Sequence, residues 1–295
     1  MKDFNHQPTW FRPTSDVGFH KLFCSEGNDE LVLQLLNAVI NEKTIVSFKR
    51  LDPYHQINID AHSTFDLYCT CDDGSRVIVE CQKGDRNRNF MNRALAYSAM
   101  AILDQAKDRW QYKFDKVYFI GLLNYIAWKE RSQAITEIAL YTSDDHTLAN
   151  DNYLQIFVEL PKLAADKDDE DFGELFLRAM RDIGKSETRP KEYSDARLDT
   201  LFDASKYKHL SNDEQSRYEK EMTTIEELKG YYEEQAQEAI AKGIAEGIEK
   251  GIAEGIVKGK AEGKVEIAKA LLAKGVDVVT IAECTGLSEE EIKSL

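Results

Sequence analysis

The sequence predicts an α/β protein with a mixed central sheet flanked by helices, followed by a helical C-terminal extension. Three observations predict this class. Two runs rich in β-branched and aromatic residues are joined by Asp73-Gly74, a strong signal for a β-hairpin. A stretch with helical periodicity separates this hairpin from a third, almost continuously apolar run. Near the C-terminus, glycine recurs at every fourth position from 243 to 263.

The N-terminal part is predicted to form one helix and then three strands. The helix covers about Ser15 to Asn41, because its apolar residues recur at helical spacing, and a break is expected near Gly27. The strands that follow are predicted at Val46 to Leu51, Phe65 to Cys71 and Arg76 to Lys83.

A second helix is predicted from about Asn89 to Ala106, and a strand covered on both faces from Lys116 to Leu123. The residues expected on the apolar side of this helix are Leu95, Met100, Ile102 and Leu103. Further strands are expected at Ile135 to Tyr141 and Leu154 to Leu160, then an acidic loop at Asp166 to Glu174 and a mainly helical remainder.

Composition and charge limit the class of protein. The chain has 295 residues, of which 42% are hydrophobic, which indicates one main folded core. No apolar run of about 18 residues is present, so we expect a cytoplasmic protein that does not bind membranes. The five cysteines show no disulfide spacing and are expected to be reduced and mostly buried.

The net charge of −15 argues against a surface that is basic throughout, the simplest sign of a nucleic-acid-binding protein. The charge is unevenly distributed, however. Between Lys83 and Lys116 there are eight basic and four acidic residues, a local net charge of +4. A cationic region therefore follows the predicted hairpin directly.

Strand alternation gathers polar side chains on one side of this hairpin. The residues predicted to share that side are Asp66, Tyr68 and Thr70 on the first strand and Ile78, Glu80 and Gln82 on the second. The opposite, apolar side holds Leu67, Cys69, Cys71, Val77, Val79 and Cys81. If the register aligns the two strands, two carboxylates and one amide come together.

Such a group suits Mg²⁺, with Mn²⁺ as a substitute, because Mg²⁺ prefers a few carboxylate oxygens and keeps several waters. Asp66 and Glu80 are the predicted metal ligands, and the backbone carbonyl of Cys81 could add a third oxygen. A metal held there would polarise a phosphodiester and activate water. Zinc bound by Cys69, Cys71 and Cys81 is the weaker alternative, because a single C-x-C is an incomplete site. No phosphate-binding glycine loop is present, so no nucleotide cofactor is expected.

Four segments carry a resemblance to a known family: PTSDVGFHKLF, FDLYCT, VIVECQK and FMNRALAYS. Their order resembles the recombination-promoting nuclease and transposase-like branch of the PD-(D/E)XK superfamily, and the resemblance spans most of the chain. It implies a restriction-endonuclease-like core, DNA as a partner and metal-dependent endonuclease activity. By the same resemblance, Asp66 is the motif aspartate, Glu80 the second acid, and Gln82 stands where a lysine is usual, although this branch often carries glutamine.

Several neighbours complete the predicted site. A neutral amide at Gln82 could orient water or phosphate but could not act as a base. Phosphate contacts are predicted for Arg93 and Tyr97, one helical turn apart, although both could instead make packing contacts. Lys83 would join them only if a bulge turned it from the opposite face. Two accessory residues are predicted in the first segment, Asp16 and Lys21. The alternative for Asp16 is that it caps the helix.

We expect a nuclease-like domain over residues 1–235, with a helical subdomain from about 170, and a glycine-repeat helix over 236–264. In this repeat, isoleucines recur every four residues and Lys alternates with Glu at the same spacing. Glycine costs a helix roughly 1 kcal/mol relative to alanine, so packing against another copy would compensate. The repeat therefore predicts homo-oligomerisation with right-handed winding; the alternative is an extension without a fixed partner.

Residues 265–295 carry a helix-turn-helix pattern, VVTIAECTGLSEEEIKSL, with Ala282, Gly286 and Ile292 at the crossing positions. The second helix would begin with Ser288 and three glutamates, which would meet DNA phosphates with like charge. The hypothesis is that this tail contacts protein rather than reads DNA. For the whole chain, the alternative to a nuclease is a catalytically decayed nuclease fold that acts as a nucleic-acid-binding or protein-binding assembly module.

Overall fold

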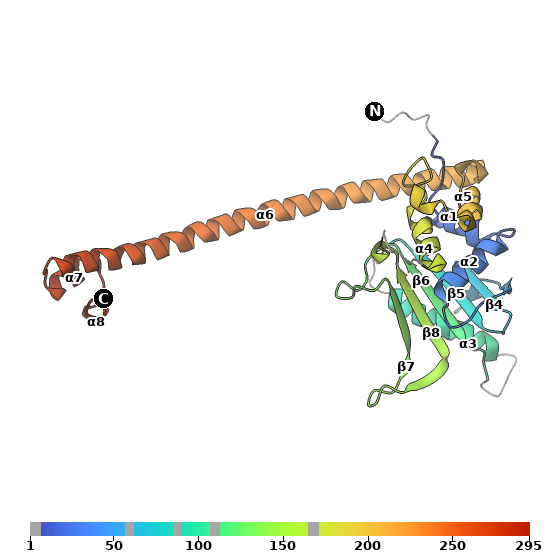
Figure 1. The fold of residues 1–295 in the computed structure, drawn as a ribbon, viewed down its shortest axis with the longest axis horizontal. Coiled ribbons are helices and arrows are strands. Elements are labelled where there is room, and N and C mark those ends of the chain that lie inside the picture. Colours follow the sequence, from blue (N-terminus) through green and yellow to red (C-terminus); the bar gives the residue numbers. More distant parts are fainter. Residues whose placement is uncertain (1–6, 57–61, 85–89, 107–112, 165–170) are drawn as a thin grey trace. The chain divides into compact units, whose positions relative to one another are not determined.

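A computed structural model describes residues 7–56, 62–84, 90–106, 113–164 and 171–295 (Figure 1). The chain divides into two compact units, Met1–Met222 and Thr223–Leu295. Most of the predicted acidic loop lies outside the described residues. The same holds for six charged residues of the predicted cationic region: Asp85, Arg86, Arg88, Lys107, Asp108 and Arg109.

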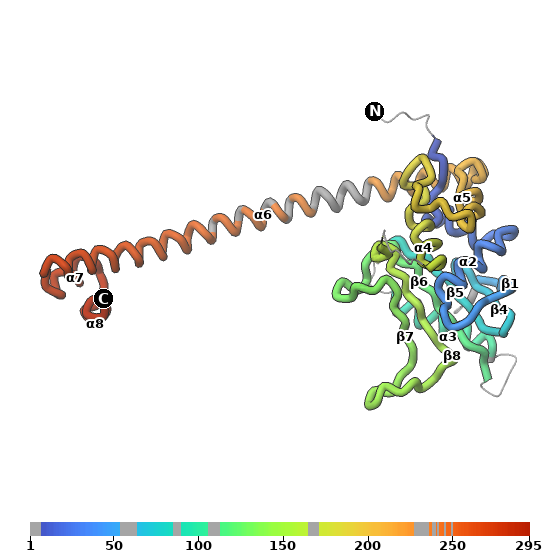
Figure 2. Tube along the Cα trace, viewed as in Figure 1, coloured from blue at the N-terminus to red at the C-terminus, as the bar shows by residue number. Residues whose placement is uncertain are grey.

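The first unit contains a six-stranded mixed sheet, in the order β1-β4-β5-β6-β8-β7. Its strands are β1 Phe48–Arg50, β4 Leu67–Cys71, β5 Arg76–Gln82, β6 Val117–Leu123, β7 Ile135–Tyr141 and β8 Leu148–Glu159. The three central strands β5, β6 and β8 run parallel, whereas β1, β4 and β7 pair antiparallel with their neighbours. A long hairpin of β7 and β8 forms one edge (Figure 2). The strands β2 Tyr54–Gln56 and β3 His62–Thr64 form a separate small sheet.

Helices of the first unit follow the predicted order. The predicted N-terminal helix is interrupted at Gly27, whose φ of +97° favours glycine, and its first part continues as a π-helical turn at His20–Cys24. The α-helices are α1 Asp16–Phe19, α2 Asp29–Val39, α3 Phe90–Ala106, α4 Phe172–Asp182 and α5 Asp199–Ala204; α6 Asn212–Ala273 begins in this unit and continues into the second. Short 3-10 turns lie at Leu160–Lys162, Lys191–Tyr193, Ala196–Leu198 and Tyr207–His209.

The sheet is covered on both faces, which confirms the predicted α/β class with a mixed sheet flanked by helices (Figure 1). Side chains of α2 and α4 pack on one face with Cys69, Val77, Val79 and Cys81. Helix α3 packs on the other face, with Tyr68 and Ile78. The predicted alternation along β4 and β5 is therefore confirmed. Three cysteines are buried among aliphatic side chains, as expected for structural thiols: Cys69, Cys71 and Cys81.

The predicted apolar side of α3 was partly wrong. Leu95 and Leu103 are 59% and 63% exposed. Small residues face the sheet instead, because Ala94, Ser98 and Ala101 are fully buried and let the helix approach closely. Met100 and Ile102 are half-buried and do pack against this cluster, as predicted.

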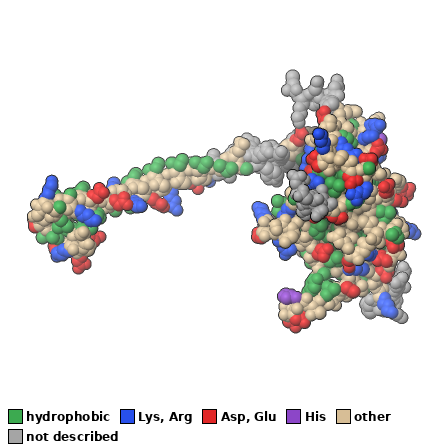
Figure 3. Space-filling view, in the orientation of Figure 1, with side chains coloured by type: hydrophobic (Ala, Val, Ile, Leu, Met, Phe, Trp, Pro, Cys, Tyr) green, Lys and Arg blue, Asp and Glu red, His purple; other side chains and the backbone are tan. Residues whose placement is uncertain are grey.

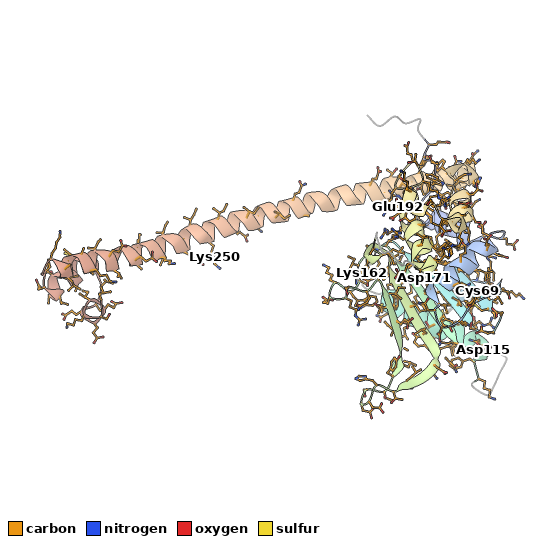
Figure 4. All side chains as sticks on the ribbon, viewed as in Figure 1. Cys69, Asp115, Lys162, Asp171, Glu192 and Lys250 are labelled. Carbon is orange, nitrogen blue, oxygen red and sulfur yellow. The ribbon has the colours of Figure 1, made fainter. Side chains whose placement is uncertain are left out.

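In the second unit, the glycine repeat is helical throughout and belongs to α6. Its isoleucines form an exposed apolar stripe, visible along the helix in Figure 3. The side chain of Lys250 projects from the same helix (Figure 4). Residues of the stripe are between 53% and 63% exposed: Ile240, Ile244, Ile248, Ile252 and Ile256.

The C-terminal end of this unit has the predicted helix-turn-helix packing. Helices α7 Val278–Thr285 and α8 Glu289–Lys293 bury Ile281 and Ile292 against Ala268 of α6. Gly286 ends α7 with a φ of +69°, and Ser288 and Glu291 form a capping box that begins α8. Among the described residues, no helix of either unit is long and apolar enough to cross a membrane.

Candidate functional site

The β4–β5 hairpin brings Asp66 and Glu80 together. Its turn is closed by Gly74, which has a φ of +88°, and β4 pairs with β5 so that Leu67 faces Val79. Asp66, one residue before β4, therefore lies opposite Glu80. The Asp66 N–H donates to Glu80 Oε1 at 3.1 Å, and the Cys81 N–H donates to Asp66 Oδ2 at 2.9 Å. Each carboxylate is thus fixed by the backbone of the other strand.

Glu80 is buried, Asp66 is exposed at the cavity, and the two carboxylates repel each other. Glu80 is 6% exposed; burial, reinforced by the charge of Asp66, raises its pKa to about 8. Asp66 as a whole residue is exposed, but its carboxylate lies among the cavity walls, and this partial desolvation raises its pKa. The nearest cation is Arg93, whose Nη2 lies 3.8 Å from Glu80 Oε2. Among the residues that the structure describes, Arg93 is the one cation within 4 Å of this acid pair.

These acids line a cavity of about 470 Å³. Five of the predicted site residues line it together: Asp66, Glu80, Gln82, Arg93 and Tyr97. Cys81 and Asp16 line it as well. The remaining lining residues were not predicted: Val17, Phe19, His20, Cys24, Thr64, Glu214 and Arg217.

Helix α3 supplies the basic side of the cavity. Arg93 donates from Nη2 to Gln82 Oε1, and its guanidinium lies 5.9 Å from the centre of the Tyr97 ring. Tyr97 in turn packs against Phe65 at 4.7 Å between ring centres. The amide of Gln82 is therefore held in one orientation, with its oxygen directed to the arginine.

Lys21 and Lys83 do not line the cavity. Lys21 Nζ lies 3.1 Å from Glu214 Oε2. Lys83 follows the end of β5 and is held by two carboxylates, Asp16 at 2.7 Å and Glu221. Asp16 lines the cavity but does not cap α1, because Ser15 Oγ accepts the Gly18 N–H at 2.9 Å.

The start of α6 also forms part of the cavity wall, which sequence reasoning missed. Glu214 and Arg217 line the cavity, and Tyr218 and Glu221 contact the core beside it. Their spacing of three, four and seven residues places them on one helix face. This spacing could have identified the helix face that packs on the core. Because the four residues are mostly polar, the sequence did not indicate a buried face here.

The oxygen donors of the site fit a hard divalent cation. No group of three or more His, Cys, Asp or Glu side chains converges as a metal site in the part of the chain that the structure describes. Asp66 and Glu80 supply two carboxylates, a number that suits Mg²⁺. The Cys81 N–H points to Asp66, and in a strand the carbonyl of the same residue points to the same side. Cys24 is a poor ligand, because burial raises the pKa of its thiol to about 12.

Comparison with known proteins agrees with this geometry. The family described as PD-(D/E)XK nuclease family transposase matches residues 13–234, which include every residue lining the cavity. The family described as Rpn/YhgA-like nuclease family, C-terminal HTH domain, matches residues 261–295. No curated protein matches the chain significantly. No solved structure does so either. Because the first match covers well over half of the sequence, the chain belongs to the PD-(D/E)XK nuclease family transposases, as the resemblance predicted.

Proposed function

We propose that the protein is a metal-dependent DNA endonuclease that hydrolyses phosphodiester bonds in the cavity beside β5. The observation that carries this proposal is the pair Asp66 and Glu80. These adjacent carboxylates are hydrogen-bonded to each other's strand, line one cavity and have one arginine within 4 Å among the described residues. A phosphodiester is itself an anion. A cation that binds both the acids and the substrate would resolve the repulsion between them.

The residues that would hold Mg²⁺ or Mn²⁺ are Asp66, Glu80 and, through its carbonyl, Cys81. When bound, the ion would supply a water of lowered pKa and neutralise charge on the phosphate. Gln82 would orient the attacking water or a phosphate oxygen, since Arg93 fixes its amide. Arg93 and Tyr97 would contact the phosphate from α3. Lys83, Asp16 and Lys21 act indirectly, by tying β5 and α1 to the start of α6.

Cleavage assays on single-stranded, duplex and branched DNA test this proposal. We expect strand scission with Mg²⁺ or Mn²⁺ and none with EDTA. Asp66→Ala and Glu80→Ala should both abolish it, whereas Asp151→Ala, an exposed acid of β8 outside the cavity, should leave it unchanged. Cleavage that persists in both cavity variants would refute the site.

We further propose that the protein self-associates through the apolar stripe of α6. Five isoleucines are more than half exposed, and a Cβ added at any glycine from Gly243 to Gly263 would meet no atom within 4 Å beyond the backbone of its own helix and its chain neighbours. Lys and Glu alternate along the same helix, with pairs such as Lys250 Nζ and Glu254 Oε1 at 3.9 Å. Another copy would therefore find both an apolar stripe and complementary charges.

Light scattering coupled to size exclusion tests the stripe. Ile248→Gln combined with Ile252→Gln should lower the molar mass of the assembly, because it removes two exposed apolar side chains and keeps helix-forming residues. Lys269→Gln, at an exposed position of the same helix beyond the glycine repeat, is the control and should preserve the assembly. An unchanged mass for the double variant would exclude the stripe as the interface.

The C-terminal helix-turn-helix is proposed to contact protein rather than enter a DNA groove. Helix α8 begins with Glu289, Glu290 and Glu291, all exposed, which would face phosphates with like charge. A gel-shift comparison of the full chain with a variant lacking residues 265–295 tests this. We expect DNA affinity to be retained; its complete loss at unchanged oligomeric state would contradict the proposal.

A non-catalytic assembly module is the second candidate. It is favoured by Gln82, which stands where the superfamily usually carries lysine and cannot take up a proton. In that case the protein would bind DNA but would not cut it with either Mg²⁺ or Mn²⁺. Glu80→Ala would then change the affinity for DNA, and there would be no cleavage rate to change. Scission that depends on Glu80 would exclude this candidate.

A further inference from the structure

The first turns of α6 present one stripe of side chains to the core of the first unit. Glu214, Arg217, Tyr218 and Glu221 follow the i, i+3, i+4, i+7 spacing of a single helix face. All four precede the boundary at Met222, so they belong to the same compact unit as the cavity. Their contacts differ in one informative respect.

Three of the four side chains bind the core. Glu214 pairs with Lys21 at 3.1 Å. The Tyr218 hydroxyl accepts the Arg12 N–H at 3.0 Å. Glu221 accepts the Asp16 and Val17 N–H groups at 2.9 and 3.3 Å and also pairs with Lys83. These bonds fix the start of α6 across α1 and the end of β5.

Arg217 is the exception. It lines the cavity that contains Asp66 and Glu80, yet its ion-pair partner among the described residues is Asp213, one turn earlier on the same helix. This pair, at 3.1 Å, has side chains that are 63% and 82% exposed. Such surface pairs contribute little and exchange readily with solvent or a ligand. The contacts of the other three side chains of this helix face thus hold Arg217 at the cavity, while Arg217 itself makes no bond to the core among the described residues.

We infer that Arg217 binds a backbone phosphate of the DNA strand that enters the cavity. This inference rests on the proposed function, from which it takes DNA as the substrate. A chain with a net charge of −15 and acids in its cavity needs local cations to hold a polyanion. Arg93 on α3 is already bonded to Gln82. Arg217 comes from a different element, and its planar guanidinium suits bidentate binding of phosphate.

Salt-dependent DNA binding tests Arg217 without requiring cleavage. The full chain carrying Glu80→Gln, a substitution expected to prevent scission, is titrated against a fluorescein-labelled DNA duplex at about 50 to 200 mM KCl. Adding Arg217→Gln should reduce the slope of log affinity against log salt by about 0.9, the value for one lost phosphate contact. Arg217→Lys should restore most of this slope.

Lys220→Gln is the matched control, because it removes one positive charge from the same helix at an exposed position outside the cavity. It should leave the slope unchanged. Equal slopes for Arg217→Gln and Lys220→Gln would overturn the inference, and so would failure of the Glu80→Gln parent to bind DNA. If the wild-type protein binds DNA but does not cut it, the endonuclease proposal fails while the assignment of Arg217 stands on the slope.

Discussion

Two carboxylate sites in the first unit show opposite electrostatic behaviour. At the end of α4, Asp182 lies 2.6 Å from Arg181 Nη2 and 2.7 Å from Lys185 Nζ, and it also accepts the Tyr193 hydroxyl. These three donors hold the pKa of Asp182 well below its usual range. At the edge of the cavity, burial raises the pKa of Asp66 and brings that of Glu80 to about 8.

The difference lies in the supply of positive charge. Asp182 is neutralised by its own neighbours in the chain, so its charge stabilises the fold. Among the described residues, Asp66 and Glu80 have one cation within 4 Å, Arg93 at 3.8 Å, so ionising both acids costs folding free energy that a bound cation would offset. A carboxylate pair that the fold leaves uncompensated is a place where a ligand is expected.

The largest difference is expected in activity. Asp66→Ala or Glu80→Ala should reduce the rate of DNA cleavage by about a thousandfold or more, roughly 4 kcal/mol of transition-state stabilisation, because each removes a ligand of the proposed metal. Asp182→Asn should retain nearly all activity. Single-turnover cleavage rates measure this, and similar losses in all three variants would erase the distinction between the two sites.

The pH dependence of stability should differ in sign. The ordinary pKa of Glu80 is 4.5, so between about pH 4.5 and 8 the folded protein keeps a proton that the unfolded chain releases. Without metal, this contribution to stability is present at low pH and is lost as the pH rises toward 8, by an amount on the order of a few kcal/mol. Asp182 has the opposite effect on the stability of the folded protein. Because its pKa is lowered in the folded state, its contribution to stability is present above about pH 3.8 and is lost on acidification.

Urea denaturation in EDTA at about pH 5.5 and 8.5 checks the Glu80 contribution. In Glu80→Gln, the free energy of unfolding should decline less between these two pH values than it does in the wild type. At the higher pH, the variant should be more stable than the wild type. Equal declines in both proteins would show that Glu80 is ionised throughout.

The gain in stability from Mg²⁺ should depend on the acids of the cavity and not on Asp182. Mg²⁺ at about a hundred times its Kd should raise the free energy of unfolding of the wild type by about 2.7 kcal/mol, because it binds the folded state. Asp182→Asn should show the same gain, and Asp66→Ala should show none. Thermal unfolding with and without Mg²⁺ measures this. A gain retained in Asp66→Ala would place the metal elsewhere.

The smallest effect is expected at Asp182. Asp182→Asn should lower the free energy of unfolding at neutral pH by about 1 to 2 kcal/mol, because its charge-assisted bonds weaken but the side chain is one-fifth exposed to screening water. Asp203→Asn, which loses a pair with Lys206 at a largely exposed position, should cost less. A gain in stability for Asp182→Asn would reverse the proposed contrast.

Much of the sheet and the acid pair could be predicted from the sequence, for local reasons. Asp73-Gly74 marks the turn, and the period of two in β4 and β5 assigns each side chain to a face. The apolar run at Val117–Leu123 predicts a strand covered on both faces. Each of these signals extends over fewer than ten residues.

Part of what the sequence did not reveal depends on contacts between residues that lie far apart in the chain. Lys83 Nζ meets Glu221, and the Arg12 N–H meets Tyr218, each pair distant along the chain. The π-helical turn at His20–Cys24 has no local composition signal that we recognise. On α3, Leu95 is exposed, and the face that packs on the sheet is formed by small residues. Hydrophobicity alone therefore did not identify the buried face of this helix.

The turn at Gly74 has a consequence for insertions and deletions. Asp66 meets Glu80 only because equal numbers of residues lie on each side of the hairpin centre. One extra residue in the turn would shift the register and move one carboxylate to the face that holds Cys69 and Val77. Loop length is as much a part of this site as the acids themselves.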